Sequence, residues 1–222
     1  MRPRTIAVCG LHSEAKAIRR GCPGIAVLAG GGDGARLERE LEALLQAGPA
    51  LVLSTGLGGG LDPELAVGAL VLDGDAALVK ALGSALPAAI RARIIGQDAI
   101  ATGISGKAAL RQATGAAVVD MESHIAARVA RHHGVPFAAI RVISDAADEE
   151  LPPAALVGMR PDGGIALGAV LASLARRPAQ LPALIRTGRH AGLAHRVLRD
   201  VYDALGRSGI FLRDFGEFAL EV

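Results

Sequence analysis

The sequence is poor in aromatic residues, with four phenylalanines, one tyrosine and no tryptophan among 222 residues. Proteins that bind single-stranded nucleic acid stack bases on aromatic side chains, and duplex binders carry a marked basic excess. Here 24 basic residues stand against 22 acidic ones, which leaves a formal charge of only +2. The composition therefore argues against a nucleic-acid partner.

Cysteine and long apolar runs are also scarce. The only cysteines, Cys9 and Cys22, are too few and too isolated for a disulfide framework or a zinc site, so we expect buried free thiols. The six histidines show no metal-ligand spacing, and we predict no metal and no resident cofactor. The N-terminus does not fit a secretory signal, and no run approaches the roughly 18 apolar residues of a membrane span. We therefore predict a cytoplasmic protein without a transmembrane segment.

Apolar residues and glycine are abundant instead, at 51% of the chain and 29 residues respectively. This combination favours an α/β fold whose mostly parallel sheet is covered by helices on both faces. Apolar runs predict strands at 5–9, 25–29, 50–54, 69–72 and 93–95, and helical periodicity predicts helices at 13–20, 35–47, 76–92, 105–114, 165–174 and 189–205. We predict one domain over residues 1–222, with residues 176–222 as a helical C-terminal extension.

Two glycine-rich segments follow predicted strands. Gly30 and Gly32 precede a helix, where backbone amides could hold an anion, and they loosely fit a dinucleotide-binding fingerprint. That fingerprint also needs an acidic residue about 20 positions later, and the next strand ends in Ser54-Thr55 instead. A tight turn is the alternative. The second segment, residues 55–60, would let backbone approach a ligand closely, or would form a steep turn between packed elements.

Glu122 and Asp145 are the strongest individual candidates for a functional site, because each follows a nearly continuous apolar run. A carboxylate in such surroundings is costly unless it is paired, hydrogen-bonded or functional. Arg141 precedes Asp145 by four residues, which places both on one face of an extended strand and lets the arginine hold the carboxylate. A purely structural ion pair is the alternative. We expect Asp120 to be solvated or to cap a helix.

Phe211, Phe215 and Phe218 gather near the C-terminus. Docking of the tail on the core, or a dimer contact, would explain them. A patch that receives a lipid-like substrate or touches a membrane surface transiently is the other interpretation.

Three segments, residues 6–14, 54–68 and 119–145, resemble the nucleoside phosphorylase and nucleosidase superfamily, which includes purine nucleoside phosphorylase and methylthioadenosine nucleosidase. The pairing of Met-Glu-Ser at 121–123 with Arg-Val-Ile-Ser-Asp at 141–145 is the specific part of this resemblance. The short chain and the arginine-rich C-terminal region look most like the hopanoid-associated phosphorylases, whose substrate would be adenosylhopane.

The resemblance implies a three-layer αβα sandwich and cleavage of the bond between ribose C1′ and purine N9. Asp145 would be the general acid that protonates the purine at N7, with Arg141 steadying it. Glu122 would accept hydrogen bonds from the ribose hydroxyls, and Met121 would pack under the sugar. Ile100 and Ala101 fall where the family places its base-binding segment.

The side from which the nucleophile attacks would be lined by Gly30, Gly32, Thr55, Gly56, Leu57 and Gly58. Related phosphorylases bring arginines and a serine to phosphate, but this chain has Glu14, Ser54 and Leu57 at those places. Glu14 would repel phosphate and could activate water. Phosphorolysis, with phosphate as co-substrate, and hydrolysis therefore both stay open.

The segment between residues 72 and 105 lacks much of the aromatic insert found in relatives, so we expect the 5′ side of the ribose to be open. The predicted partner is a purine nucleoside with a large apolar, lipid-like 5′ group. The resemblance also implies a homodimer or larger homo-oligomer. Two other functions remain: a dinucleotide-dependent reductase and a non-catalytic nucleotide-binding protein.

Overall fold

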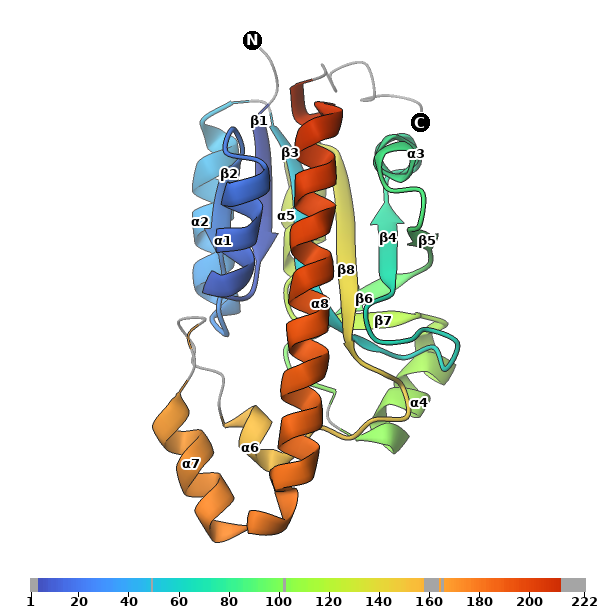
Figure 1. Cartoon of the computed structure of the whole chain (residues 1–222). Coiled ribbons are helices and arrows are strands. Elements are labelled where there is room, and N and C mark those ends of the chain that lie inside the picture. Colours follow the sequence, from blue (N-terminus) through green and yellow to red (C-terminus); the bar gives the residue numbers. More distant parts are fainter. Residues whose placement is uncertain (1–3, 49, 102, 158–163, 165, 213–222) are drawn as a thin grey trace.

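An eight-stranded sheet organises the chain, and helices cover both of its faces (Figure 1). The computed structural model describes residues 4–48, 50–101, 103–157, 164 and 166–212. The strands are β1 (Arg4–Cys9), β2 (Ala26–Ala29), β3 (Ala50–Gly60), β4 (Leu70–Gly74), β5 (Ile90–Arg91), β6 (Ile94–Gly96), β7 (Val118–Asp120) and β8 (Phe137–Asp145). The helices are α1 (His12–Gly21), α2 (Gly34–Gln46), α3 (Ala76–Ala85), α4 (Ile104–Thr114), α5 (Ser123–His132), α6 (Pro153–Leu156), α7 (Leu167–Arg176) and α8 (Leu181–Ser208), with short 3-10 helices η1 (Pro178–Gln180) and η2 (Ile210–Leu212).

The main path of the sheet runs β2-β1-β3-β8-β4-β5, and β7 joins β6 to the end of β3. Neighbouring strands are parallel except in the pairs β3–β7 and β4–β8. This confirms the predicted αβα architecture with a mostly parallel sheet. Because β1, β3 and β8 lie side by side and parallel, their carboxyl ends meet at one edge, where ligands of open α/β sheets bind.

Helices α1 and α8 cover one face of the sheet, and α2 and α5 cover the other. The amphipathic pattern predicted for α2 is present, since Leu37, Leu41 and Leu45 are buried and Asp33 caps the helix by accepting a hydrogen bond from the Arg36 amide at 2.9 Å. On the opposite face, the C-terminal half of α8 buries Leu198 and Tyr202 in the core.

Three predicted elements differ from the structure by more than two residues in their bounds. The first is β3, which extends through the glycine run to Gly60 instead of ending at residue 54, because Gly56–Gly58 pair with β8 and the last two glycines pair with β7. The second is α3, which ends at Ala85, before Pro87 and the short strand β5. The third is α8, which begins at Leu181 because Pro182 lies in its first turn, where proline has no intrahelical donor to lose.

Within the part of the chain that the structure describes, no helix is both long and apolar enough to cross a bilayer. Phe211 is partly buried and packs against the core beside α8, in agreement with the docking interpretation. Phe215 and Phe218 lie outside the described residues.

Candidate active site

Arg141 on β8 is the largest fully buried side chain and the only cation in a group of carboxylates. Its Nε lies 2.8 Å from Asp120 Oδ2, its NH2 donates to Ser54 Oγ at 2.8 Å, and Glu122 Oε2 lies 3.9 Å from NH2. Burial by itself lowers the pKa of Arg141, but Asp120, Glu122 and Glu14 outweigh burial and raise it. We call Glu14, Asp120, Glu122 and Arg141 the central cluster.

Asp120 joins this cluster to α5. Its Oδ1 accepts hydrogen bonds from the backbone amides of Glu122 at 2.8 Å and Ser123 at 2.7 Å. These amides belong to the start of α5, where the N–H groups have no intrahelical partner. The expectation that Asp120 caps a helix therefore holds, but the expectation that it is solvated is wrong: its side chain is 1% exposed.

Glu122 is largely enclosed, with a side chain that is 13% exposed. Burial raises its pKa from 4.5 to about 8, Arg141 opposes this rise, and Asp120 and Glu14 add to it. Gly10 lies so close that a Cβ at that position would come 2.7 Å from Glu122 Oε1. Glycine at position 10 therefore lets the end of β1 approach the carboxyl group.

Glu14 lies on α1 and turns its carboxylate toward the same glycine-rich edge. Oε2 accepts hydrogen bonds from the amides of Gly10 at 3.0 Å and Leu11 at 2.8 Å, and Oε1 accepts from the amide of Leu57 at 2.8 Å. A Cβ on Gly56, whose φ of +153° also favours glycine, would come 2.7 Å from Oε1. Three backbone amides, two just after β1 and one in the glycine-rich part of β3, therefore converge on one carboxylate.

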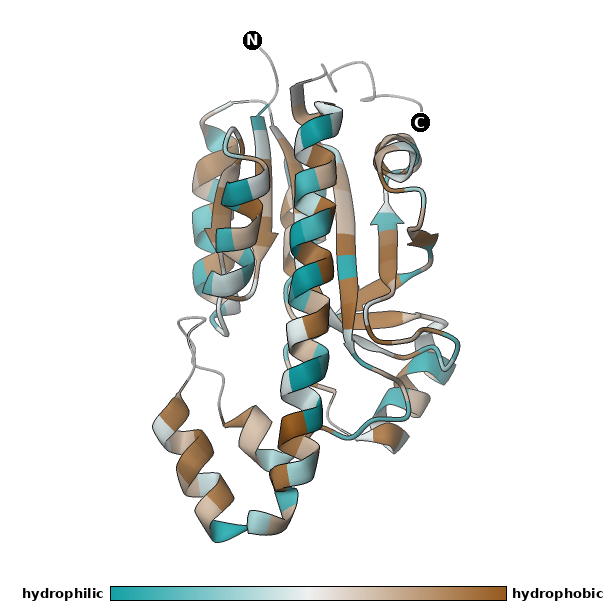
Figure 2. Ribbon diagram, in the orientation of Figure 1, coloured by the Kyte–Doolittle hydropathy of each residue, from teal (hydrophilic) through white to brown (hydrophobic). Residues whose placement is uncertain are grey.

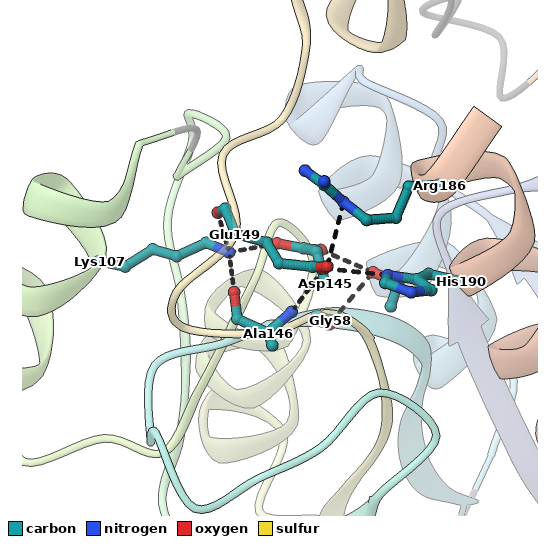
Figure 3. A network of polar contacts seen from close by, with 8 residues as sticks. Gly58, Lys107, Asp145, Ala146, Glu149, Arg186 and His190 are labelled. Carbon is teal, nitrogen blue, oxygen red and sulfur yellow. Dashed lines mark hydrogen bonds and ion pairs between the residues drawn. The ribbon is translucent and has the colours of Figure 1, made fainter. Parts of the chain in front are cut away.

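Asp145, at the end of β8, belongs to a different group (Figure 3). Lys107 Nζ, on α4, donates to Asp145 Oδ2 at 2.6 Å, and it also donates to the carbonyl oxygens of Ala146 at 2.7 Å and Glu149 at 3.1 Å. The Ser144 hydroxyl donates to Asp145 Oδ1 at 2.8 Å. All three ammonium donors of the fully buried lysine are thus satisfied. We call Lys107, Asp145 and Glu149 the loop cluster.

The loop cluster is tied to α8 through the side chain of Glu149. His190 Nδ1 lies 3.0 Å from Glu149 Oε2, and Arg186 Nε lies 3.5 Å from Oε1 (Figure 3). The same Oε2 accepts a hydrogen bond from the amide of Ala146 at 3.2 Å. The loop that follows Asp145 is therefore held between α4 on one side and α8 on the other.

The predicted contact between Arg141 and Asp145 is wrong, and a β-bulge is the reason. Gly58 pairs with Ile143 but Gly59 pairs with Asp145, so Ser144 is an extra residue on β8. The bulge breaks the alternation that would have put Arg141 and Asp145 on one face. Accordingly, Arg141 lies against Gly58 and Asp145 against the next residue, Gly59.

The other predicted site residues lie around these two clusters. Thr55 is fully buried. Burial raises the pKa of the Tyr202 phenol on α8, and the Thr55 hydroxyl opposes this rise. Met121 and Ile100 are half-buried, and Ala101 packs against the small apolar group under α4. A Cβ on Gly58 would come 2.7 Å from Val118, which explains why β3 needs glycine there.

The loop at Gly30 and Gly32 has the hydrogen bonds of a turn. The amide of Gly30 donates to Cys9 O at 2.8 Å, and the amide of Gly31 donates to Gly10 O at 2.9 Å. The Arg36 guanidinium donates to the carbonyl oxygens of Ala29 and Gly30 at 3.0 and 2.8 Å. Two of the loop amides are therefore used within the protein, which favours the turn interpretation over anion binding.

The sequence interpretation missed Lys107. A lysine among alanines on a short helix usually points to solvent, and only contact with the loop after Asp145 distinguishes this one. The available signal was compositional, since Lys107 is one of three lysines in a chain whose other 21 basic residues are arginines.

Metal and thiol chemistry find little support at this edge of the sheet. Among the described residues, no three His, Cys, Asp or Glu side chains are grouped so that they could hold a metal ion. Cys9 and Cys22 are free and buried. Burial raises the pKa of the Cys9 thiol, and Glu14 and Glu122 raise it further, so Cys9 is not an activated nucleophile.

The chain is similar to known proteins in sequence and in fold. Residues 75–176 match the family model described as Phosphorylase superfamily. A Helicobacter pylori methylthioadenosine nucleosidase mutant with 5′-methylthioadenosine in its active site has a similar fold, with a TM-score of 0.64 and 15% identity over 91% of this chain and 99% of that one. Comparison with curated protein sequences gives no match.

Two further solved structures share the fold. One is the futalosine hydrolase of Helicobacter pylori, with a TM-score of 0.58 and 17% identity over 65% of this chain and 89% of that one. The other is a 5′-methylthioadenosine/S-adenosylhomocysteine nucleosidase from Colwellia psychrerythraea in complex with adenine, with a TM-score of 0.60 and 18% identity over 79% and 96%. The family match over residues 75–176 and these shared folds support the superfamily predicted from the sequence.

Proposed function

The chain has the fold and a sequence match of the phosphorylase superfamily, and we propose that it cleaves the N-glycosidic bond of a purine nucleoside and releases the base. One observation carries the proposal. Glu14 and Glu122 meet around Gly10 at the carboxyl end of β1, and Asp145 ends the parallel strand β8 at the same edge of the sheet. Three acidic groups from distant parts of the sequence thus converge where such folds bind ligands.

Cleavage requires stabilisation of both halves of the substrate. As the C1′–N9 bond breaks, its electron pair moves into the purine, and Asp145 would donate a proton to N7. Because Asp145 is paired with the Lys107 ammonium at 2.6 Å, the proton given to N7 would pass from Lys107 through Asp145, and the proton that Glu14 takes from water would return to Lys107 through solvent. Glu122 would accept hydrogen bonds from the ribose hydroxyls, with Met121 under the sugar, and Arg141 would keep Glu122 in place. Ile100 and Ala101 would lie beside the base.

Water is the nucleophile that the surroundings of Glu14 favour. Its carboxylate already occupies the amides of Gly10, Leu11 and Leu57, where a phosphate would otherwise find donors. A second anion at this place would be repelled, whereas a water molecule could give its proton to Glu14 as its oxygen attacks C1′. The products would be the free base and the free sugar.

The substrate that we propose carries a large apolar 5′ group, as in adenosylhopane, which would place the reaction in hopanoid biosynthesis. The support is the resemblance to the hopanoid-associated phosphorylases, together with the short connection between β4 and α4, whose described residues form only α3, β5 and β6. Such a connection leaves little chain to close over the 5′ carbon.

The test is base release from a 5′-alkyl adenosine, with adenosine and methylthioadenosine as comparisons, each with and without inorganic phosphate. We expect adenine and free sugar without phosphate, fastest for the alkyl substrate. A requirement for phosphate and a sugar 1-phosphate product would overturn hydrolysis but keep the superfamily reaction. Faster base release from adenosine than from the alkyl substrate would overturn the proposal that the 5′ side of the ribose is open. Glu14→Gln should slow hydrolysis at least 10²-fold, in the range of a lost general base.

A dinucleotide-dependent reductase is disfavoured by the Gly30 loop, because the amides of Gly30 and Gly31 bind backbone carbonyl oxygens. A spectroscopic titration with NADPH tests this alternative directly, and saturable binding at micromolar concentration would revive it. A non-catalytic nucleotide-binding protein would bind adenosine without releasing adenine.

A further inference from the structure

A helical hairpin extends from the same end of the sheet as Asp145 (Figure 1). We define it as residues 166–193, which include α7, η1 and the first turns of α8. Gln180 holds it together, since its Nε2 donates to Ser173 O at 2.8 Å and its Oε1 accepts from the Ala154 amide at 2.9 Å. α7 packs mainly on α6 and η1 and has no buried residue. The hairpin is thus held by contacts within itself and with α6, and α7 is left largely uncovered.

Large apolar side chains are concentrated on its surface. Among the described residues, eight such side chains are exposed, and five of them lie on the hairpin: Leu167 at 69%, Leu171 at 65%, Leu181 at 43%, Ile185 at 46% and Leu193 at 37%. In Figure 2 the ribbon of α7 and of the start of α8 has brown, hydrophobic bands. A hollow of about 390 Å³ between α6 and α7 is lined by more apolar groups and by Arg176 and Arg177. A surface of this kind marks an interaction site.

The charge on this part of the chain has one sign. Residues 163–199 contain six arginines and no Asp or Glu, although the whole chain has 24 basic and 22 acidic residues. The rest of the sequence is therefore net acidic. Arg176 and Arg177 close α7 at the exposed tip, and Arg186 and Arg189 are exposed on the adjacent turns of α8.

We propose that the helical hairpin docks on the surface of an anionic phospholipid bilayer. Leucines and isoleucine would enter the boundary between headgroups and acyl chains, and the arginines would contact the phosphates. A second copy is a poorer occupant, because residues 166–193 contain no Asp or Glu that could pair with the arginines of another hairpin. Docking would place the end of the sheet that carries Asp145 beside the bilayer.

The test is flotation of the purified protein with vesicles of phosphatidylcholine alone or mixed equally with phosphatidylglycerol, at low salt and at high salt. We expect binding to the anionic vesicles, weak binding to the neutral ones, and a loss of binding at high salt. Leu167→Asp with Leu171→Asp should lower partitioning at least tenfold, and Arg176→Ala with Arg177→Ala should lower it severalfold on anionic vesicles only.

Matched controls are Ile90→Asp, an exposed apolar residue on β5, and Arg20→Ala with Arg39→Ala, exposed arginines away from the hairpin. These variants should float like the unmodified protein, and circular dichroism should show that every variant is folded. Flotation unaffected by the hairpin variants, or absent altogether, would overturn the proposal. So would a dimer, measured by light scattering, that the leucine variants dissociate while vesicle binding is absent. No nucleoside is needed, so the result is independent of the proposed reaction.

Discussion

The central cluster and the loop cluster both bury carboxylates, but they differ in how many carboxylates share one cation. The central cluster sets three carboxylates around one guanidinium, and burial with this excess of negative charge raises the pKa of Glu122 to about 8. The loop cluster pairs Asp145 with Lys107, whose remaining donors bind two carbonyl oxygens. Glu122 of the central cluster can therefore exchange a proton near neutral pH. In the loop cluster the charges of Lys107 and Asp145 balance, and a substrate must contact this pair.

The largest expected effect is loss of the shared cation. Arg141→Met would leave three carboxylates without their guanidinium, and removing one partner of a buried ion pair costs about 3–5 kcal/mol. The free energy of unfolding, measured by urea denaturation, should fall by this amount. Arg111→Met is the control, since Arg111 pairs with Asp62 at 2.7 Å but is 36% exposed, and such pairs contribute about 1 kcal/mol or less. Equal losses in the two variants would contradict the central role of Arg141.

Lys107→Met should lower the stability less than Arg141→Met does, but it should lower the activity more. Asp145 keeps its hydrogen bond from Ser144, so the expected loss is about 1–3 kcal/mol, the penalty of unsatisfied buried groups. Base release should fall by about tenfold or more, because the acid loses its adjacent proton source. Lys80→Met, on the exposed side of α3, should change neither quantity.

A double variant sharpens this prediction. When Asp145→Asn is added to Lys107→Met, the second change should cost little stability or restore some, because no unpaired charge remains. Additive losses in urea denaturation would mean that the two residues are not coupled.

The pH dependence of stability should reveal the raised pKa of Glu122. The folded protein holds its proton up to about pH 8, whereas the unfolded chain loses it near pH 4.5, so the contribution of Glu122 to stability should be greatest below pH 4.5 and fall as pH rises toward 8. The slope is at most about 1.4 kcal/mol per pH unit. Glu122→Gln should reduce the slope of stability against pH, which denaturation midpoints between pH 5 and 8 would measure. An unchanged slope would show that Glu122 ionises normally.

The sequence predicts the framework and the candidate carboxylates but not their partners. Apolar runs locate β1 and β8, and the charged residues within or after such runs include Arg141, Glu122 and Asp145. Glu14 was identified only through the resemblance, since a glutamate on an amphipathic helix ordinarily faces solvent. Its three amide donors come from the residues after β1 and from β3, which only the fold brings together.

Two errors have physical causes that a single sequence does not reveal. The extra residue Ser144 creates a bulge that separates Arg141 from Asp145, and whether a strand bulges depends on the strand it pairs with. The glycine run after residue 54 has a composition typical of a loop. It becomes a strand because β7 and β8 lie close enough to pair with it, and close packing requires glycine there.

The central claim is that Asp145 protonates the departing purine, and one measurement tests it most directly. Adenine release from a 5′-alkyl adenosine should be followed by chromatography for the unmodified protein, Asp145→Asn and Asp148→Asn, with nucleoside binding measured by calorimetry. The account predicts a rate about 10² to 10⁴-fold lower for Asp145→Asn, with binding retained, and an unchanged rate for Asp148→Asn, which alters an exposed carboxylate in the same loop. Full activity of Asp145→Asn, or binding without adenine release by the unmodified protein, would contradict it.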